Sequence, residues 1–257
     1  MREPLLFIPG MMCDARLFQP QIEHFSRTHN VMVACTTEGE RIEEIASTIL
    51  SDAPQKFALA GLSMGGIIAM EILRRAPERV MRICLMDTNP LAETPQSAAG
   101  YEPMIVGIKS GRMMDVIRGF LKPEFLAPGP MRPVVLTAVR DMAESLGPEV
   151  FLRQIKALQR RRDQQAVLRK AKVPALVVCG AYDGLTPVKR HEFMAELIPY
   201  AKLAVLQDAG HLPTLEAPDQ VNALLAEWLR ASHMCCAVKR GAPMCRQGGV
   251  LLRLCQA

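Results

Sequence analysis

The sequence predicts an α/β fold in which a mostly parallel sheet is covered by helices on both faces. Short apolar runs of about four to six residues alternate with longer stretches of helical periodicity along the chain. This alternation is typical of βαβ units, whose parallel strands are buried on both faces. The chain has 257 residues, of which 49% are hydrophobic and 22% charged, so it can bury a substantial core.

The apolar runs and the helical stretches can be assigned in chain order. The predicted strands are Pro4–Ile8, Val31–Cys35, Phe57–Ala60, Met81–Met86, Ala175–Cys179 and Leu203–Leu206. The predicted helices between them are Leu17–Arg27, Ile42–Asp52, Met64–Arg75 and Val188–Ile198, and Gln220–Arg230 closes the series.

One long interval interrupts the alternation of strand and helix. From about residue 89 to residue 172 the sequence has only amphipathic helical pieces, namely Met113–Leu121, Val134–Leu146 and Glu149–Ala157. We therefore expect a core built from residues 1–88 and 173–231, with residues 89–172 forming a helical lid that is inserted late in the sheet. Such an insertion would lie over the edge of the sheet as a cap.

The last segment, residues 232–257, differs in composition from the rest. It contains four of the eight cysteines and four basic residues, and it has no acidic residue. Helical amphipathicity stops there, so we expect an appended, flexible tail. A targeting or metal-binding role is the alternative, although the spacing of its cysteines is irregular for a zinc site.

Composition excludes several classes of partner. The formal net charge is +5, but most of the excess lies in the tail, and no basic patch with interleaved aromatic residues suggests nucleic-acid binding. No apolar run approaches the length of a membrane span or of a signal-peptide core, so we expect no membrane association and a cytoplasmic location. The body cysteines, Cys13, Cys35, Cys84 and Cys179, fit reduced thiols in such a compartment.

A serine flanked by glycines is the first candidate for chemistry. Gly61–Gly65 reads G-L-S-M-G and lies between a predicted strand and the predicted helix Met64–Arg75. This context is that of a nucleophile elbow, a sharp turn that needs small residues two positions before and after the serine. Ser63 is therefore predicted to be a nucleophile, and a helix-capping serine is the alternative.

A serine nucleophile needs a base and an acid that orients the base. His211 directly follows the last predicted strand, at the carboxyl edge where ligands bind in open α/β sheets. The other four histidines are interpreted as exposed or capping. Asp183 and Asp87 both follow strands and both obey the order serine, acid, histidine; Asp183 is preferred because Thr186-Pro187 anchors its loop.

Three stretches together resemble the α/β-hydrolase superfamily: Gly61–Gly66, Gly180–Pro187 and Gly210–Pro218. Their G-x-S-x-G-G, G-x-x-D-x-x-T-P and G-H-x-x-x-x-E-x-P patterns are typical of its esterase, lactonase and carbon–carbon bond hydrolase members. The resemblance covers roughly residues 4 to 230. It implies the α/β-hydrolase fold and a catalytic triad of Ser63, Asp183 and His211.

The resemblance also implies an oxyanion hole made by two backbone N–H groups. One belongs to Met64, after the nucleophile, and the other to Met11, in the loop after the first strand. The usual His-Gly pair of that loop is Pro9-Gly10 here, so the loop must be held in another way. Gly10 is expected to permit close approach of the backbone, and Pro9 to stiffen the entry to the loop.

The predicted function is that of a serine hydrolase, a carboxylesterase acting through an acyl-enzyme on a small-molecule ester of short to medium chain. No metal and no organic cofactor is expected. An enol-lactonase or a carbon–carbon bond hydrolase with the same triad is an alternative, as is an acyltransferase or ligand-binding protein with little turnover. The oligomeric state does not follow from the sequence.

Methionines of the insertion and of the loops suggest where the substrate binds, because their flexible side chains form tolerant apolar surfaces. The pocket residues expected on this basis are Met12, Met104, Met113 and Met114, and the alternative is that they form the core of the lid. The run Arg160–Arg162 would attract a carboxylate-bearing substrate, but a solvated helix face is the preferred interpretation.

Overall fold

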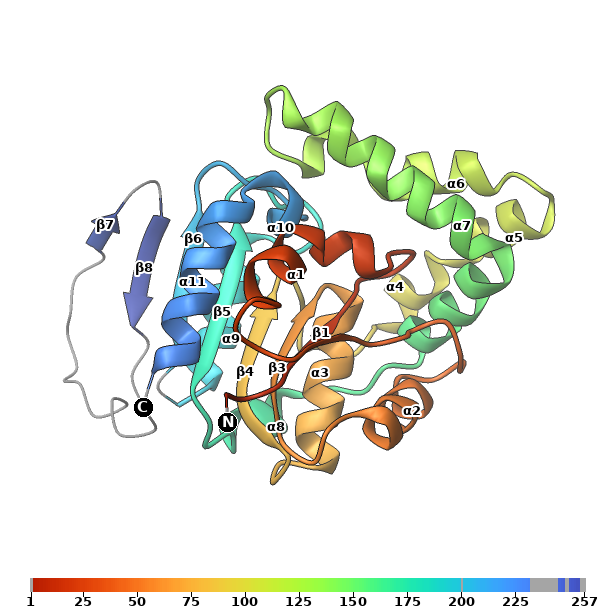
Figure 1. Cartoon of the computed structure of the whole chain (residues 1–257). Helices are drawn as coiled ribbons and strands as arrows, with labels where there is room; N and C mark the ends of the chain where they lie inside the picture. The colour runs from red at the N-terminus through yellow and green to blue at the C-terminus, as the bar shows by residue number, and fades with distance from the viewer. Residues whose placement is uncertain (1, 200, 232–244, 248–249, 255–257) are drawn as a thin grey trace.

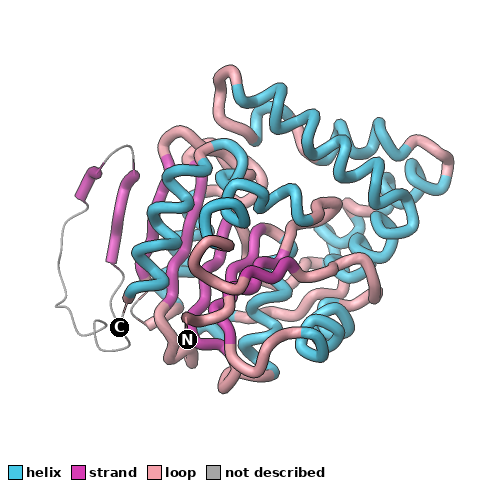
Figure 2. Tube along the Cα trace, viewed as in Figure 1, coloured by secondary structure: helices cyan, strands magenta, loops and turns pink. Residues whose placement is uncertain are grey.

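The computed structural model describes residues 2–199, 201–231, 245–247 and 250–254. A central sheet has the strand order β2-β1-β3-β4-β5-β6-β8-β7, and Figure 2 shows helices around its strands except at the edge formed by β8 and β7. The strands are β1 (Leu5–Ile8), β2 (Val31–Val33), β3 (Phe57–Leu62), β4 (Val80–Met86), β5 (Ala175–Gly180), β6 (Lys202–Leu206), β7 (Cys245–Gln247) and β8 (Val250–Leu254).

The strands from β1 to β6 pair in parallel, which confirms the predicted mostly parallel sheet. Antiparallel β8 pairs with β6 and β7 with β8, so two short strands from the tail extend the sheet. Residues 232–244 of the tail lie outside the described residues. Flexibility of the tail stays a prediction.

Helices connect the parallel strands and cover both faces of the sheet. On the core they are α1 (Gln19–Phe25), α2 (Ile42–Asp52), α3 (Met64–Arg75), α9 (Val188–Leu197), α10 (Pro213–Glu216) and α11 (Pro218–Arg230). Buried residues of α2, α3 and α9 belong to one hydrophobic cluster and those of α1 and α11 to another. The alternating side chains of the strands are divided between the two clusters: Leu6 and Ile8 belong to the first, Leu5 and Phe7 to the second.

The segment between β4 and β5 contains only helices and loops. Its helices are α4 (Pro95–Ala99), α5 (Glu102–Lys109), α6 (Met113–Phe120), α7 (Met131–Gln159) and α8 (Gln165–Arg169), and Figure 1 shows α5, α6 and α7 together at the upper right of the molecule. The long α7 is broken at Gly147, whose φ of 79° is left-handed and which precedes Pro148. The two predicted pieces, Val134–Leu146 and Glu149–Ala157, are the two arms on either side of this break.

No helix among the described residues is long and apolar enough to cross a membrane. Of the cysteines whose side chains are described, Cys13, Cys84 and Cys179 are buried, Cys35 is exposed, and all four are free thiols. The division of the chain into a core and a lid as separate units stays a prediction.

Candidate active site

Ser63 occupies a sharp turn between β3 and α3. Its φ of 56° lies in the left-handed region, which costs free energy for a residue with a Cβ. The glycines on either side permit the turn: a Cβ on Gly61 would lie 2.3 Å from the carbonyl oxygen of Gly65, and a Cβ on Gly65 would lie 2.0 Å from that of Ile8. Both distances are shorter than real contacts, so the small residues that the sequence pattern emphasises are sterically required.

The backbone of the turn is fixed by hydrogen bonds. The Ser63 N–H donates to the Met86 carbonyl at 2.9 Å, and the Thr88 hydroxyl donates to the Ser63 carbonyl at 2.7 Å. A Cβ on Gly66 would lie 2.6 Å from the Thr88 Oγ1 atom, so Gly66 makes the room for this contact. Residues that follow β4 therefore hold the strained turn at the end of β3.

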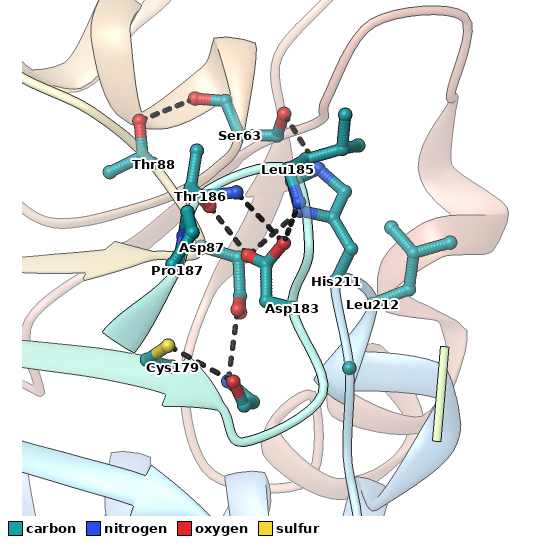
Figure 3. A network of polar contacts seen from close by, with 12 residues as sticks. Ser63, Asp87, Thr88, Cys179, Asp183, Leu185, Thr186, Pro187, His211 and Leu212 are labelled. Atoms are coloured by element: carbon teal, nitrogen blue, oxygen red, sulfur yellow. Dashed lines mark hydrogen bonds and ion pairs between the residues drawn. The ribbon is translucent and has the colours of Figure 1, made fainter. Parts of the chain in front are cut away.

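The loop after β6 brings His211 to Ser63 (Figure 3). The His211 Nε2 atom lies 3.1 Å from the Ser63 Oγ atom, and its Nδ1 atom lies 3.0 Å from Asp183 Oδ2. The His211 N–H also donates to the Phe125 carbonyl at 2.8 Å, which ties this loop to the inserted segment. Three residues far apart in sequence thus form one hydrogen-bonded chain from hydroxyl to imidazole to carboxylate.

Asp183 accepts several hydrogen bonds besides that of His211. The Leu185 and Thr186 N–H groups donate to its Oδ1 atom at 2.8 and 2.9 Å, and the Thr186 hydroxyl donates to Oδ2 at 2.5 Å. Burial alone would raise the pKa of Asp183, but the His211 charge and the hydrogen bonds from His211 and Thr186 outweigh it and hold the pKa well below its ordinary value. The carboxylate facing His211 is therefore ionised.

Asp87, the other acid considered from the sequence, lies next to Asp183 (Figure 3) and is not hydrogen-bonded to His211. It is completely buried, its Oδ1 atom accepts the Gly180 N–H at 2.9 Å, and its Oδ2 atom has no hydrogen-bond partner. Burial and then the charge of Asp183 raise the pKa of Asp87 well above its ordinary value. Asp87 is therefore a neutral acid next to an ionised one.

His191 is fully buried, so its interpretation as an exposed or capping histidine is wrong. Its Nε2 atom accepts the Thr88 N–H at 3.0 Å, and burial lowers its pKa to about 4. A neutral imidazole at this place supports the same segment that holds the Ser63 turn. Helix α9 is polar in sequence, and only the tertiary structure shows that this residue faces inward.

Two groups of potential metal ligands occur among the described residues: Asp87 with Cys179 and His191, and Asp87 with Asp183 and His211. In the first, His191 Nε2 already accepts a backbone N–H. In the second, both ring nitrogens of His211 are engaged by Ser63 and Asp183. Protein contacts thus engage the histidine Nε2 atom in both groups, and the expectation that no metal is needed stays a prediction.

Two backbone amides lie beside the site, that of Met11 in the loop after β1 and that of Met64 at the start of α3. Within the described residues, neither the Met11 N–H nor the Met64 N–H donates to a protein acceptor. The Met12 N–H, by contrast, donates to Gln154 Oε1 at 2.8 Å, and the Gln154 side chain in turn donates to the Thr36 carbonyl at 3.0 Å. Gln154 is buried in α7, so the inserted segment holds this loop in the absence of the usual histidine. No sequence motif indicates this residue.

The explanation expected for Gly10 is wrong. A Cβ on Gly10 would lie 3.4 Å from the Leu62 carbonyl oxygen and the Ser63 Cβ atom, which is ordinary van der Waals contact. Close approach of the backbone therefore does not require glycine at this position. The left-handed residue of the loop is Met12, with a φ of 54°.

Glu216 holds the loop that carries His211. Its carboxylate accepts N–H groups from Gly210 at 3.0 Å, from Leu212 at 2.8 Å and from Ala127 at 2.7 Å. The glutamate of the G-H-x-x-x-x-E-x-P pattern thus bridges the histidine loop and the inserted segment. Its contribution to the site is structural.

Ser63 and His211 open into a cavity of about 420 Å³. Its lining is both apolar and polar and comprises Met11, Ser63, Met64, Ile67, Thr88, Asn89, Leu91, Ala92, Glu93, Thr94, Ser97, Tyr101, Phe120, Leu158, Arg161, Leu185, Thr186, Arg190 and His211. A smaller space of about 30 Å³ that also touches Ser63 is lined in part by Met12 and Phe120.

The methionines expected in the pocket are divided by the structure. Met12 lines the smaller space, whereas Met104, Met113 and Met114 line neither and are partly buried against the hydrophobic core. The expectation that these three residues line the pocket is wrong, because the helices that carry them direct their side chains to the hydrophobic core. Much of the lining of the cavity beside Ser63 comes instead from residues 88–101, directly after β4, most of which belong to the start of the predicted insertion.

The interpretation of Arg160–Arg162 as a solvated helix face is wrong for its central residue. The Arg161 side chain is only 10% exposed, its Nη2 atom lies 2.9 Å from Glu93 Oε1, and it lines the cavity. Arg162 is 60% exposed and pairs with Glu43. The chain after α7 turns Arg161 inward while its neighbours stay at the surface.

Comparison with known proteins agrees with this fold. The family model of the alpha/beta hydrolase family matches residues 5–224, and the chain belongs to this family. The match spans every strand from β1 to β6, together with the segments that carry Ser63, Asp183 and His211.

Several relatives and solved structures are similar over most of their length. A pimeloyl-[acyl-carrier protein] methyl ester esterase of Aromatoleum aromaticum is 28% identical over 75% of this chain and 81% of its own. A thermophilic esterase of Thermogutta terrifontis has a TM-score of 0.80 at 26% identity, covering 89% of both chains. The enol-lactonase of Burkholderia xenovorans LB400 has a TM-score of 0.79 at 23% identity, covering 90% of this chain and 93% of its own.

Proposed function

We propose that this protein is a serine hydrolase that cleaves carboxylic esters of short to medium acyl chain through an acyl-enzyme. The observation that carries the proposal is the hydrogen-bonded chain from Ser63 through His211 to Asp183, which lies beside a cavity of about 420 Å³. Membership of the alpha/beta hydrolase family and similarity to esterases support it. Methyl esters are suitable first substrates, because the relatives include methyl ester esterases.

In the proposed mechanism, the Ser63 Oγ atom attacks the ester carbonyl while His211 Nε2 accepts its proton. Asp183 holds the Nδ1–H tautomer and stabilises the imidazolium that forms. The free N–H groups of Met11 and Met64 donate to the oxyanion, and the start of α3 places positive potential at the same point. His211 then protonates the leaving alcohol and activates water, which hydrolyses the acyl-enzyme.

Asp87 has a supporting role in this proposal. Because its raised pKa keeps Asp87 neutral next to Asp183, Asp183 is the negative charge that faces the imidazolium of His211. The segment of residues 89–172 acts as the lid, since it provides Gln154 to the oxyanion loop and much of the cavity lining. The proposed substrate is a small molecule, and the proposed location is cytoplasmic.

Hydrolysis of p-nitrophenyl esters from acetate to decanoate tests the proposal. We expect activity in wild type and a fall of several orders of magnitude in Ser63→Ala. The matched control Ser51→Ala, whose serine is exposed on α2, should be as active as wild type. A rapid burst of p-nitrophenol would report the acyl-enzyme. An inactive wild type would refute the esterase function, and an active Ser63→Ala variant would refute the nucleophile.

A further inference from the structure

The cavity beside Ser63 is lined by both apolar and polar side chains. Apolar side chains come from the loop after β1, α3, α6 and α7, namely Met11, Ile67, Phe120 and Leu158. The segment after β4 and the loop that leads into α9 contribute the polar residues Asn89, Glu93, Thr94, Ser97, Tyr101 and Thr186, together with the apolar Leu91, Ala92 and Leu185. A substrate that fills this cavity therefore meets both hydrocarbon and hydrogen-bonding groups.

Three residues with formally charged side chains line the cavity: Glu93, Arg161 and Arg190. Two guanidinium groups against one carboxylate leave a net positive charge. The ionised Asp183 is not part of the lining and lies behind His211. The cavity of a proposed ester hydrolase therefore carries a positive charge that the ester reaction itself does not use.

Arg161 is held rigidly among the residues that line the cavity. Its Nη2 atom pairs with Glu93 at 2.9 Å, and its Nε atom donates to the Leu91 carbonyl at 2.9 Å. Glu93 is itself held by the hydroxyls of Tyr101 and Ser97. In the part of the chain that the structure describes, the Arg161 Nη1 atom has no acceptor, so a guanidinium fixed on two sides keeps donors for a ligand.

Arg190 differs from Arg161 because its side chain is exposed and has no protein partner among the described residues. It lies in the first turn of α9, which contains no acidic residue. A cation at the positive end of a helix is unfavourable, whereas an anion bound there would be stabilised by both the side chain and the helix. Arg190 is thus an uncompensated charge at the cavity wall.

We propose that Arg161 and Arg190 bind a carboxylate carried by the substrate, so that the preferred esters are half-esters of dicarboxylic acids. Guanidinium groups bind carboxylates through paired N–H donors, and the fixed Arg161 loses little freedom on binding. The methylene chain between the carboxylate and the ester lies against apolar side chains of the cavity lining, and the ester carbonyl lies at Ser63. This inference rests on the proposed ester hydrolysis and defines its substrate class.

Monomethyl adipate and methyl hexanoate form a matched pair for the test, since they differ by a terminal carboxylate in place of a methyl group. We expect wild type to have the higher kcat/KM for monomethyl adipate, measured by proton release, and the preference to shrink with added salt. Arg190→Gln should lower the ratio of the two kcat/KM values roughly tenfold or more. Arg161→Lys, which keeps a charge near Glu93, should lower it by a smaller factor.

Lys189→Gln is the control, because Lys189 is an exposed cation of the same helix turn that does not line the cavity. It should leave the ratio unchanged. The proposal is overturned if wild type prefers methyl hexanoate, if Arg190→Gln leaves the ratio unchanged, or if Lys189→Gln lowers it equally.

Failure of the proposed function gives a different result, namely that wild type hydrolyses neither ester. Calorimetric binding to Ser63→Ala then decides the carboxylate site independently of catalysis. Tighter binding of monomethyl adipate than of methyl hexanoate, weakened by Arg190→Gln, supports the site. Equal binding of the two esters overturns it.

Discussion

Asp183 and Asp87 can be separated by replacing each with asparagine, and the expected losses differ by orders of magnitude. Asp183→Asn removes the negative charge 3.0 Å from His211 Nδ1 and disturbs an acceptor of three further hydrogen bonds. The tautomer of His211 and the imidazolium both lose their partner. We expect kcat to fall by about 10³- to 10⁴-fold, or roughly 4–5.5 kcal/mol of transition-state stabilisation.

Asp87→Asn should cost less than about tenfold. Asp87 is already neutral because burial and the charge of Asp183 raise its pKa, so the substitution removes no charge. The asparagine carbonyl can still accept the Gly180 N–H, which Asp87 Oδ1 accepts at 2.9 Å.

The assay is kcat and kcat/KM for p-nitrophenyl butyrate, with the free energy of unfolding in urea measured for each variant. The unfolding data show whether a loss of activity comes from a loss of folded protein. Equal losses in both variants, or a larger loss in Asp87→Asn with stability retained, would refute the assignment of Asp183 as the acid partner of His211.

Three further predictions concern the residues that support the site. Gln154→Ala should lower kcat about ten- to a hundredfold with little change in KM, because the oxyanion loop loses its anchor; unchanged kcat would contradict this. Gly65→Ala should destabilise folding by about 1–3 kcal/mol in thermal unfolding, whereas Gly119→Ala, with open space around it, should not. Burial lowers the pKa of His191 from 6.5 to about 4, so the unfolded chain binds this proton at a higher pH than the folded protein does. The contribution of His191 to stability is therefore complete above pH 6.5, and up to about 3 kcal/mol is lost as pH falls toward 4. His191→Gln, which keeps an acceptor for Thr88, should flatten stability over that range in urea titrations; an unchanged slope would contradict the assignment.

Local sequence was sufficient to predict the elements that carry the chemistry. Every strand from β1 to β6 was located to within about two residues at each end, because buried parallel strands are continuous apolar runs. The helix Met64–Arg75 was predicted with the bounds that the structure has. The G-x-S-x-G pattern has a steric cause that acts within a few residues of Ser63, so it can be recognised without the fold.

The alternation of strand and helix, which predicts a parallel sheet, also limited where His211 could lie. Parallel strands end at the same edge, so residues after β3, β5 and β6 converge there. Position alone could not separate Asp183 from Asp87, because both follow strands that pair with each other. The choice depends on which carboxylate contacts the imidazole and on burial, and both are properties of the tertiary structure.

The sequence by itself determined the fold class, the nucleophile elbow and the candidate base, since these depend on local periodicity and on sterics between near neighbours. Only the tertiary structure placed Gln154 against the loop after β1, buried His191, and turned Arg161 into the cavity. These three positions depend on contacts between segments more than a hundred residues apart or on which face of a helix or turn is covered. Such contacts leave no short-range pattern in the sequence, because any residue of suitable size and polarity can make them.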